Sequence, residues 1–191
     1  VESNEQELET IRLFLRFFQK PEFLVSLIEQ MEIMKPDQIG LKYLLATSYH
    51  RTGDFSKLKE IISRTPLPET VRDITGERQT CIQKALYGID LKACTKWAES
   101  AFSKNPNSLA NRFTLALCYL QKNNPQSARS LLAHLLQRSP PLCPTQRIIG
   151  ALTLHRNQAS EQAKQWAPIK HISLLTDAEK KFLGEIMHSR K

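Results

Sequence analysis

Residues 109–142 read LANRFTLALCYLQKNNPQSARSLLAHLLQRSPPL, and this stretch decides the fold of the chain. Apolar residues recur in it at steps of three and four, as at Leu131, Leu132, Leu135 and Leu136. That spacing places them on one face of an α-helix. A short polar turn divides the stretch into two such helices, which must then lie antiparallel. The stretch therefore predicts a helical hairpin.

The same frame recurs along the chain. Pro36, Pro106 and Pro140 each close an apolar stretch, and the last two are 34 residues apart. Units that begin near residues 5, 39, 75, 109 and 143 follow one another at steps of 34, 36, 34 and 34 residues. A constant period in this range indicates one helical hairpin that is copied along the chain, because one hairpin cannot bury its apolar face and stacked hairpins can.

The unit from residue 109 resembles a tetratricopeptide repeat (TPR). A leucine–small pair and a tyrosine on the first helix match the family pattern, as do a small residue, two apolar residues and a final proline: Leu115, Ala116, Tyr119, Ala128, Leu132, Leu135 and Pro140. Arg112 departs from it, since the family often has tryptophan there. The resemblance implies an all-α fold, a right-handed α-solenoid of stacked antiparallel hairpins without a β-sheet. It covers one domain, residues 1–191, with units near 5–38, 39–74, 75–108, 109–142 and 143–176 and a capping helix at 177–188.

In the TPR family, fixed positions of the first helices face a concave groove that binds partners. The resemblance carries these positions over to Tyr43, Thr47, His50, Gln79, Gln83, Tyr87, Phe113, Leu117, Leu120, Arg147 and Leu154. One subset of the family grips a chaperone carboxylate with Lys, Asn and Arg, and the polar residues here do not reproduce that set. The apolar middle of the row suits an apolar or amphipathic segment of a protein partner. Alternatively, part of the row packs against a terminal helix of the same chain, because exposed apolar patches of this size are usually covered.

Residues 177–188 predict a lone helix that closes the array. Thr176 is expected to cap it, and its apolar residues fall on one stripe: Ala178, Phe182, Leu183, Ile186 and Met187. We expect this helix to pack on the hairpin that contains Ile149 and Trp166. We also expect Ala128 to lie where the two helices of its hairpin nearly touch.

The net charge of +8 is unevenly distributed. Residues 1–34 carry −4, so residues 35–191 carry +12. Between Ser100 and Thr176 the sequence has one acid, Glu161, against nine Lys or Arg residues. Such asymmetry can attract nucleic acid or an anionic membrane, or it can reflect solvated residues on outer helix faces. No helix-turn-helix, zinc or RNP-type motif accompanies it.

Four cysteines are present, Cys81, Cys94, Cys118 and Cys143, without C-x-x-C pairs or zinc-like spacing. Three of them fall on apolar helix faces, where a free thiol acts as a small apolar residue. Cys81 and Cys94 are expected to face each other across one hairpin, so a disulfide is the alternative in an oxidising compartment. Unpaired cysteines favour the cytoplasm.

No pattern in the sequence indicates catalysis. H-E-x-x-H, G-x-S-x-G and phosphate-binding glycine loops are absent, and the five histidines lack metal-ligand spacing. We therefore expect no enzyme, cofactor, metal or small-molecule substrate. The 34-residue repeat, together with the absence of catalytic motifs, predicts a non-catalytic scaffold that binds a peptide or helix of a protein partner in its groove. The alternatives are a basic surface that docks on nucleic acid or an anionic membrane, and a structural or oligomerisation segment of a larger protein, as expected if Val1 begins an excised piece.

Overall fold

The chain is helical throughout the part that the structure describes. The computed structural model describes residues 21–71, 75–138, 143–167, 172 and 175–187, so the first half of the unit near 5–38 and Pro140 lie outside it. These residues form ten helices and no strand, which confirms the all-α prediction. None of these helices is both long and apolar enough to cross a bilayer. They are α2 (Pro21–Met34), α3 (Ile39–Thr52), α4 (Phe55–Arg64), α5 (Thr75–Leu86), α6 (Leu91–Lys104), α7 (Leu109–Gln121), α8 (Pro125–Leu136), α9 (Pro144–Arg156), α10 (Ser160–Trp166) and α11 (Asp177–Met187).

The turns inside four successive hairpins share one backbone geometry. Each contains a residue with a positive φ, and these four residues are 35 apart in the chain: Gly53 (φ 76°), Gly88 (φ 71°), Asn123 (φ 57°) and Gln158 (φ 65°). The amide of the next residue then donates to the carbonyl oxygen five residues before it, as from Asp54 to Tyr49 at 3.0 Å and from Ala159 to Leu154 at 2.9 Å. A left-handed residue followed by this bond ends a helix and reverses the chain. The hairpins α3–α4, α5–α6, α7–α8 and α9–α10 are therefore built alike.

Polar side chains fix where several helices begin. Asp54 accepts a hydrogen bond from the Lys57 amide at 3.1 Å, and Asn124 accepts one from the Ser127 amide at 3.1 Å. Each bond satisfies one of the amides that a helix start leaves without a partner inside the helix. Pro125 adds a residue whose fixed φ suits the first helical position.

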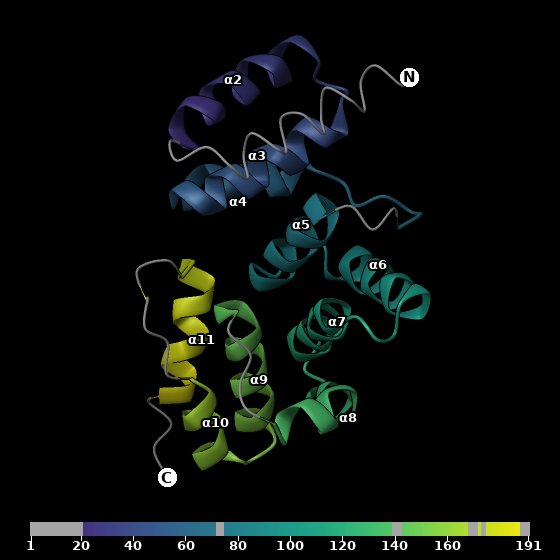
Figure 1. The fold of residues 1–191 in the computed structure, drawn as a ribbon, viewed down its shortest axis with the longest axis vertical. Coiled ribbons are helices and arrows are strands. Elements are labelled where there is room, and N and C mark those ends of the chain that lie inside the picture. Colours follow the sequence, from purple (N-terminus) through teal and green to yellow (C-terminus); the bar gives the residue numbers. More distant parts are fainter. Residues whose placement is uncertain (1–20, 72–74, 139–142, 168–171, 173–174, 188–191) are drawn as a thin grey trace.

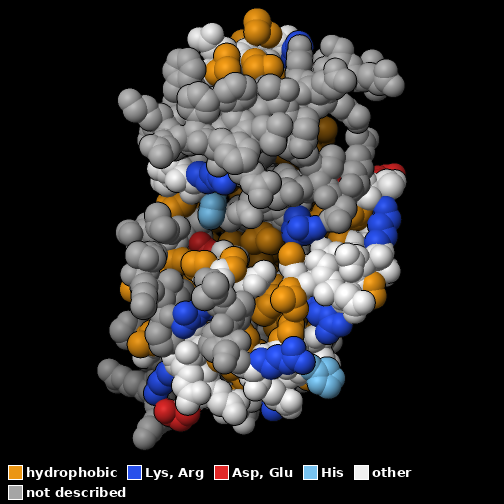
Figure 2. Space-filling view, in the orientation of Figure 1, with side chains coloured by type: hydrophobic (Ala, Val, Ile, Leu, Met, Phe, Trp, Pro, Cys, Tyr) orange, Lys and Arg blue, Asp and Glu red, His pale blue; other side chains and the backbone are white. Residues whose placement is uncertain are grey.

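Alternate helices form a continuous row, which we call the inner row: α3, α5, α7 and α9. Each of them packs on the next, and α9 packs on α11, while α4, α6, α8 and α10 each pack beside the preceding helix of the row (Figure 1). Successive helices of the series α3, α5, α7, α9 and α11 begin 33 to 36 residues apart in the chain. In the same orientation, hydrophobic side chains gather in the middle of the face, with Lys and Arg side chains scattered around them (Figure 2).

Side-chain hydrogen bonds join successive units of the array at similar chain separations. The residues joined in this way are 32 to 36 apart, and two of the acceptors, Ala85 and Leu120, lie in the last turn of an inner-row helix. The bonds run from Lys104 Nζ to Val71 O (2.6 Å), Gln121 Nε2 to Ala85 O (2.6 Å), Arg156 Nη1 to Leu120 O (2.9 Å) and Asn157 Nδ2 to Pro125 O (2.9 Å).

Small residues lie where helices approach most closely. A Cβ built on Gly150 of α9 would overlap ring carbons Cε3 and Cζ3 of Trp166 in α10. A Cβ on Gly76 of α5 would lie 2.9 Å from Cβ of Tyr43 in α3. Ala128 is fully buried, in agreement with its expected place at the contact of α7 and α8.

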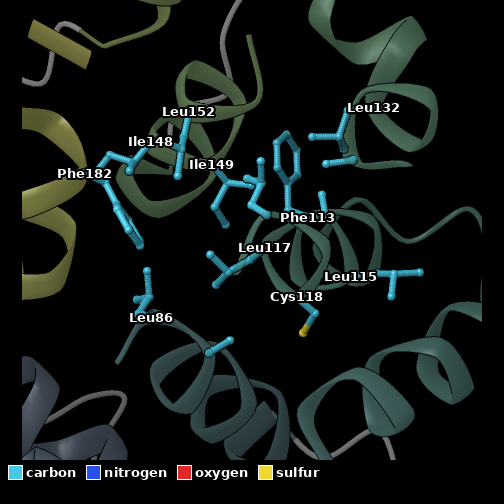
Figure 3. Packing of buried hydrophobic residues seen from close by; sticks show 14 of the residues in the cluster. Leu86, Phe113, Leu115, Leu117, Cys118, Leu132, Ile148, Ile149, Leu152 and Phe182 are labelled. Atoms are coloured by element: carbon cyan, nitrogen blue, oxygen red, sulfur yellow. The ribbon is translucent and has the colours of Figure 1, made fainter. Parts of the chain in front are cut away.

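Buried apolar side chains form two clusters. The smaller one joins α2, α3 and α4, and the larger one runs from α5 to α11. Within the larger cluster, Leu117 of α7 lies between Ile149 of α9 and Leu86 of α5 (Figure 3). The inner row therefore supplies much of the core.

Candidate partner-binding face

The apolar residues expected to line an open groove are inside the protein. Phe113, Leu117, Leu120 and Leu154 are at most 3% exposed. The expectation that they form an open apolar surface is wrong for this structure. They belong to one buried cluster that extends from α5 to α11 and includes Phe182 and Ile186. Within the inner row, α11 packs on α9.

The polar residues of the predicted row divide into two groups. Tyr43 is buried and its hydroxyl donates to Pro66 O at 2.9 Å, while Gln83 is fully buried with no hydrogen-bond partner at either amide atom. These two side chains are enclosed and cannot contact a partner in this conformation. The others are half-buried at the face: Thr47, His50, Gln79, Tyr87 and Arg147.

Arg147 has a structural role at this face. Its Nε donates to the carbonyl oxygen of Trp166 at 3.0 Å. Trp166 is the last residue of α10, so the bond satisfies a carbonyl at a helix end. Arg147 therefore holds α9 and α10 together rather than standing free for a ligand.

The start of α11 is fixed to α9 through one carboxylate. Thr176 Oγ1 accepts the Glu179 amide at 3.2 Å, and Glu179 Oε2 accepts the Thr176 amide at 2.8 Å, which forms a capping box. The predicted N-cap at Thr176 is thus confirmed. Glu179 Oε1 accepts a further hydrogen bond from Thr145 Oγ1 of α9 at 2.6 Å. The buried carboxylate of Glu179 therefore sets both the start of α11 and its position on α9.

The same end of α11 reaches the hairpin α3–α4. Lys180 Nζ lies 5.7 Å from the centre of the Phe55 ring. Burial raises the pKa of Tyr87, which follows α5, and hydrogen bonding with Thr176 opposes that shift. Burial lowers the pKa of His50, and the charge of the nearby Glu179 opposes that shift. The start of α11 therefore lies near the α3–α4 hairpin as well as on α9.

Arg156 of α9 holds the other end of α11. Its Nε and Nη2 donate to the two carboxylate oxygens of Glu185 at 2.9 and 3.0 Å. Its Cζ also lies 6.0 Å from the centre of the Phe182 ring. The hydrogen bond from Arg156 lowers the pKa of Glu185. A bidentate pair fixes orientation as well as distance, so these contacts define the register of α11 on α9.

The middle of α11 is apolar and buried. Phe182 and Ile186 are buried, Ala178 and Leu183 are half-buried, and the Phe182 ring points toward Leu86 and Ile148 (Figure 3). Met187, by contrast, is 54% exposed. The expected stripe is therefore narrower than the sequence suggested. The packing of α11 on the α9–α10 hairpin is confirmed.

The described part of the protein has one cavity beside α11 and another away from it, and the sequence predicted neither. One, of about 520 Å³, adjoins the Arg156–Glu185 pair, and the other, of about 670 Å³, lies between α6, α7 and α8. The first is lined by Leu120, Gln121, Asn123, Pro125, Arg156 and Glu185. The second is lined by Glu99, Phe102, Ser103, Leu115, Tyr119, Gln126, Ser127, Ser130 and Leu131.

Sequence reasoning missed the residues that position α11. Arg156 lies two residues after the predicted groove residue Leu154, and no pattern in one sequence pairs it with Glu185. The contact of Glu179 with Thr145 was also missed, although the T-x-x-E spacing of Thr176 and Glu179 is the signal of a capping box. Such a signal fixes where a helix starts but does not say where that helix lies.

Hydrogen-bond donors, one bidentate ion pair and buried apolar side chains surround α11. Such groups can hold a helix in one register. Among the described residues, no cluster of His, Cys, Asp or Glu is arranged to hold a metal ion. Comparisons of the chain with family models, with curated proteins and with solved structures find no match.

Proposed function

We propose that the chain is a right-handed, TPR-like solenoid and a non-catalytic scaffold whose inner row holds an amphipathic helix of a protein partner. The observation that carries this proposal is α11, which packs on α9 of the row through an apolar middle and through polar groups of α9 at both ends. In this proposal α11 is the chain's own occupant of the site, and a partner helix takes its place. The 35-residue spacing of the four left-handed turn residues supports the resemblance to the TPR family.

The contacts of α11 indicate what a partner helix must carry. An aromatic ring takes the place of Phe182, a carboxylate three residues later pairs with Arg156 as Glu185 does, and an aliphatic residue follows as at Ile186. Residues three and four apart lie on one face of a helix, so one partner helix can present all three groups.

Because α11 is part of the same chain as its site, a partner helix must compete with a tethered helix. An isolated helix of eleven residues is marginal in water, so docking keeps α11 folded. A tethered segment acts at an effective concentration on the order of millimolar. A free helix at micromolar concentration therefore competes only if it binds more tightly than α11, or if the docking of α11 is weakened.

The test weakens α11 in the full chain and offers its sequence in trans. The variant carries Phe182→Ala and Glu185→Lys, and the probe is a fluorescent peptide with the sequence of residues 175–188. Loss of the buried ring removes about 3–5 kcal/mol of docking free energy, and the Glu185→Lys substitution places a second positive charge beside Arg156. We expect fluorescence anisotropy to show the peptide binding at least about tenfold more tightly to the variant than to the wild type.

Two further variants make the result interpretable. Lys181→Ala alters an exposed residue of α11 and should leave peptide affinity at the wild-type level. Adding Arg156→Glu to the weakened variant should abolish peptide binding, because the partner of the peptide's own Glu185 is reversed in charge. A folded weakened variant that binds the peptide no better than the wild type contradicts the proposal.

The charge-based alternative gains no separate support from the described contacts. Several of its cations are held by the protein itself: Lys104 by Val71 O, Arg112 by Pro106 O, Arg147 by Trp166 O, Arg156 by Glu185 and Lys164 by Glu161. Lys170 lies outside the described residues. Binding to phosphates weakens steeply with salt, so a salt titration of labelled RNA, DNA and anionic vesicles separates this alternative from helix binding.

A further inference from the structure

Three buried cysteines from three consecutive helices meet in the core, and we call them the thiol triad: Cys81 of α5, Cys94 of α6 and Cys118 of α7. Besides burial, hydrogen bonding with the thiols of Cys118 and Cys94 raises the pKa of Cys81. Cys81 Sγ lies 3.6 Å from the carbonyl oxygen of Cys94, and Cys94 Sγ lies 3.5 Å from that of Ile89. All three are fully buried free thiols. Figure 3 shows the Cys118 sulfur on the side of α7 that faces α5 and α6.

The thiols of Cys81 and Cys94 are not equivalent. Burial raises the pKa of Cys81. The hydrogen bond from Cys81 lowers the pKa of Cys94, and the ammonium of Lys84 acts in the same direction. Lys84 is itself buried, with Nζ 3.9 Å from Asp90 Oδ2. Because the thiolate is the nucleophile in sulfur chemistry, Cys94 is placed to attack and Cys81 to resolve.

The first turn of α6 provides a route to Cys94. The N-cap of α6 is Asp90, which has a φ of 49° and makes no side-chain capping bond. A left-handed backbone costs a residue with a side chain about 1 kcal/mol. A turn that combines this strain with a missing cap opens at a lower free energy than the whole fold. Cys94 lies at the end of that turn, so it is the first of the three thiols that such an opening would expose.

We propose that the thiol triad is a redox-reactive site at which a peroxide converts Cys81 and Cys94 into a disulfide. With hydrogen peroxide, the Cys94 sulfur attacks one oxygen, the O–O bond breaks, and the departing hydroxide takes up a proton to leave as water. The Cys81 sulfur then attacks the Cys94 sulfenic acid, the S–S bond forms, the S–O bond breaks, and a second water leaves with the Cys81 proton. The two thiols lose two electrons and the peroxide gains them.

Cys118 gives this site a second state. Its thiolate can attack the Cys81 sulfur of the disulfide, which forms Cys81–Cys118 and releases the Cys94 thiol without a further oxidant. The first disulfide clips α5 to α6 within one hairpin, and the second joins α5 to α7 of the next hairpin. Because α5 carries Gln79 and is followed at once by Tyr87, either clip restrains part of the partner-binding face.

Peptide mapping of the oxidised wild-type chain tests this proposal. Cys143 is exposed and outside the triad, so it is first blocked with an alkylating agent on the native protein. The full chain is then treated with hydrogen peroxide, denatured, alkylated again and digested without reductant. We expect a peptide pair linked through Cys81 and Cys94, while circular dichroism during the reaction shows unchanged helix content. Recovery of all three triad thiols in the reduced form overturns the proposal, as does oxidation that proceeds only after the helices unfold.

Single substitutions assign the roles of the three thiols. Cys81→Ser should leave the Cys94 sulfenic acid unresolved, so that dimedone traps it. Cys94→Ser should slow the consumption of peroxide about tenfold or more. Cys118→Ser should leave the yield of the first disulfide unchanged. Peroxide consumption that is the same in Cys94→Ser as in the wild type contradicts the assignment of the nucleophile, and the wild-type mapping remains decisive if a variant does not fold.

Discussion

Replacing Gly150 with alanine tests the closest helix contact in the fold. The new Cβ would overlap carbons Cε3 and Cζ3 of Trp166, whose ring is 4% exposed and cannot swing into solvent. Overpacking costs about 1–3 kcal/mol, and a rigid ring places the cost near the upper end. The better helix propensity of alanine returns about 1 kcal/mol. We therefore expect a net loss of about 2 kcal/mol.

Gly184 provides a matched control on α11. It also lies inside a helix, but a Cβ built on it meets no atom within 4 Å. Gly184→Ala should therefore stabilise the protein by about 0.5–1 kcal/mol. In a chain of this size, 1 kcal/mol shifts Tm by about 2–4 °C, so thermal unfolding followed by circular dichroism should lower Tm for Gly150→Ala and raise it for Gly184→Ala. Equal stabilisation by both substitutions would refute the packing of Trp166 against α9.

Further outcomes follow from buried or charged groups. Ala128→Leu should cost about 1–3 kcal/mol by overpacking the contact of α7 and α8, and an unchanged urea midpoint would mean that the hairpin register is wrong. The folded-state pKa of His50 is lowered, so the unfolded chain binds the proton more readily, and stability should fall as the pH drops below about 6.5, a loss that His50→Gln should remove. The pKa of Glu185 is lower in the fold than its value of about 4.5 in the unfolded chain, so ionised Glu185 stabilises the fold above pH 4.5 and this contribution is lost as the pH falls further. Glu185→Gln should therefore make the loss of stability in acid less steep. Deleting residues 176–191 should expose apolar surface and increase dye binding or aggregation, whereas an equally stable, monomeric truncation would contradict the capping role of α11.

The sequence was sufficient to predict the helices and their pairing. Spacing of apolar residues predicted the hairpins, and Gly53 and Gly88 were visible as turn residues because glycine adopts a left-handed backbone at little cost. Gln158 occupies the same geometry, yet glutamine carries no turn signal, so the regular 35-residue spacing of these turns became visible only in the structure. Thr176 and the apolar face of α11 were likewise sufficient to predict a capped, amphipathic terminal helix.

The hairpin on which α11 packs was predicted, but the contacts that hold it there and the burial of the groove residues were not. Family positions place Leu117 and Leu154 toward the concave side, but a position on a helix does not say what lies over it. The contacts that hold α11 on α9 are pairs distant in the chain, such as Thr145 with Glu179 and Arg156 with Glu185. Single-sequence patterns contain no information on such pairs. The thiol triad was partly foreseen, since Cys81 and Cys94 were expected to face each other, but the contact with Cys118 was not.

Amide hydrogen exchange over α11 in the full chain tests the central claim most directly, because the proposed function depends on this helix being held by the inner row. An undocked helix of eleven residues frays in water and exchanges nearly as fast as an unfolded peptide. The account predicts that residues 177–187 are protected to an extent similar to α9, and that Arg156→Gln increases exchange in α11 while leaving α6, which Arg156 does not contact, unchanged. Exchange of wild-type α11 at the rate of a free peptide would contradict the account.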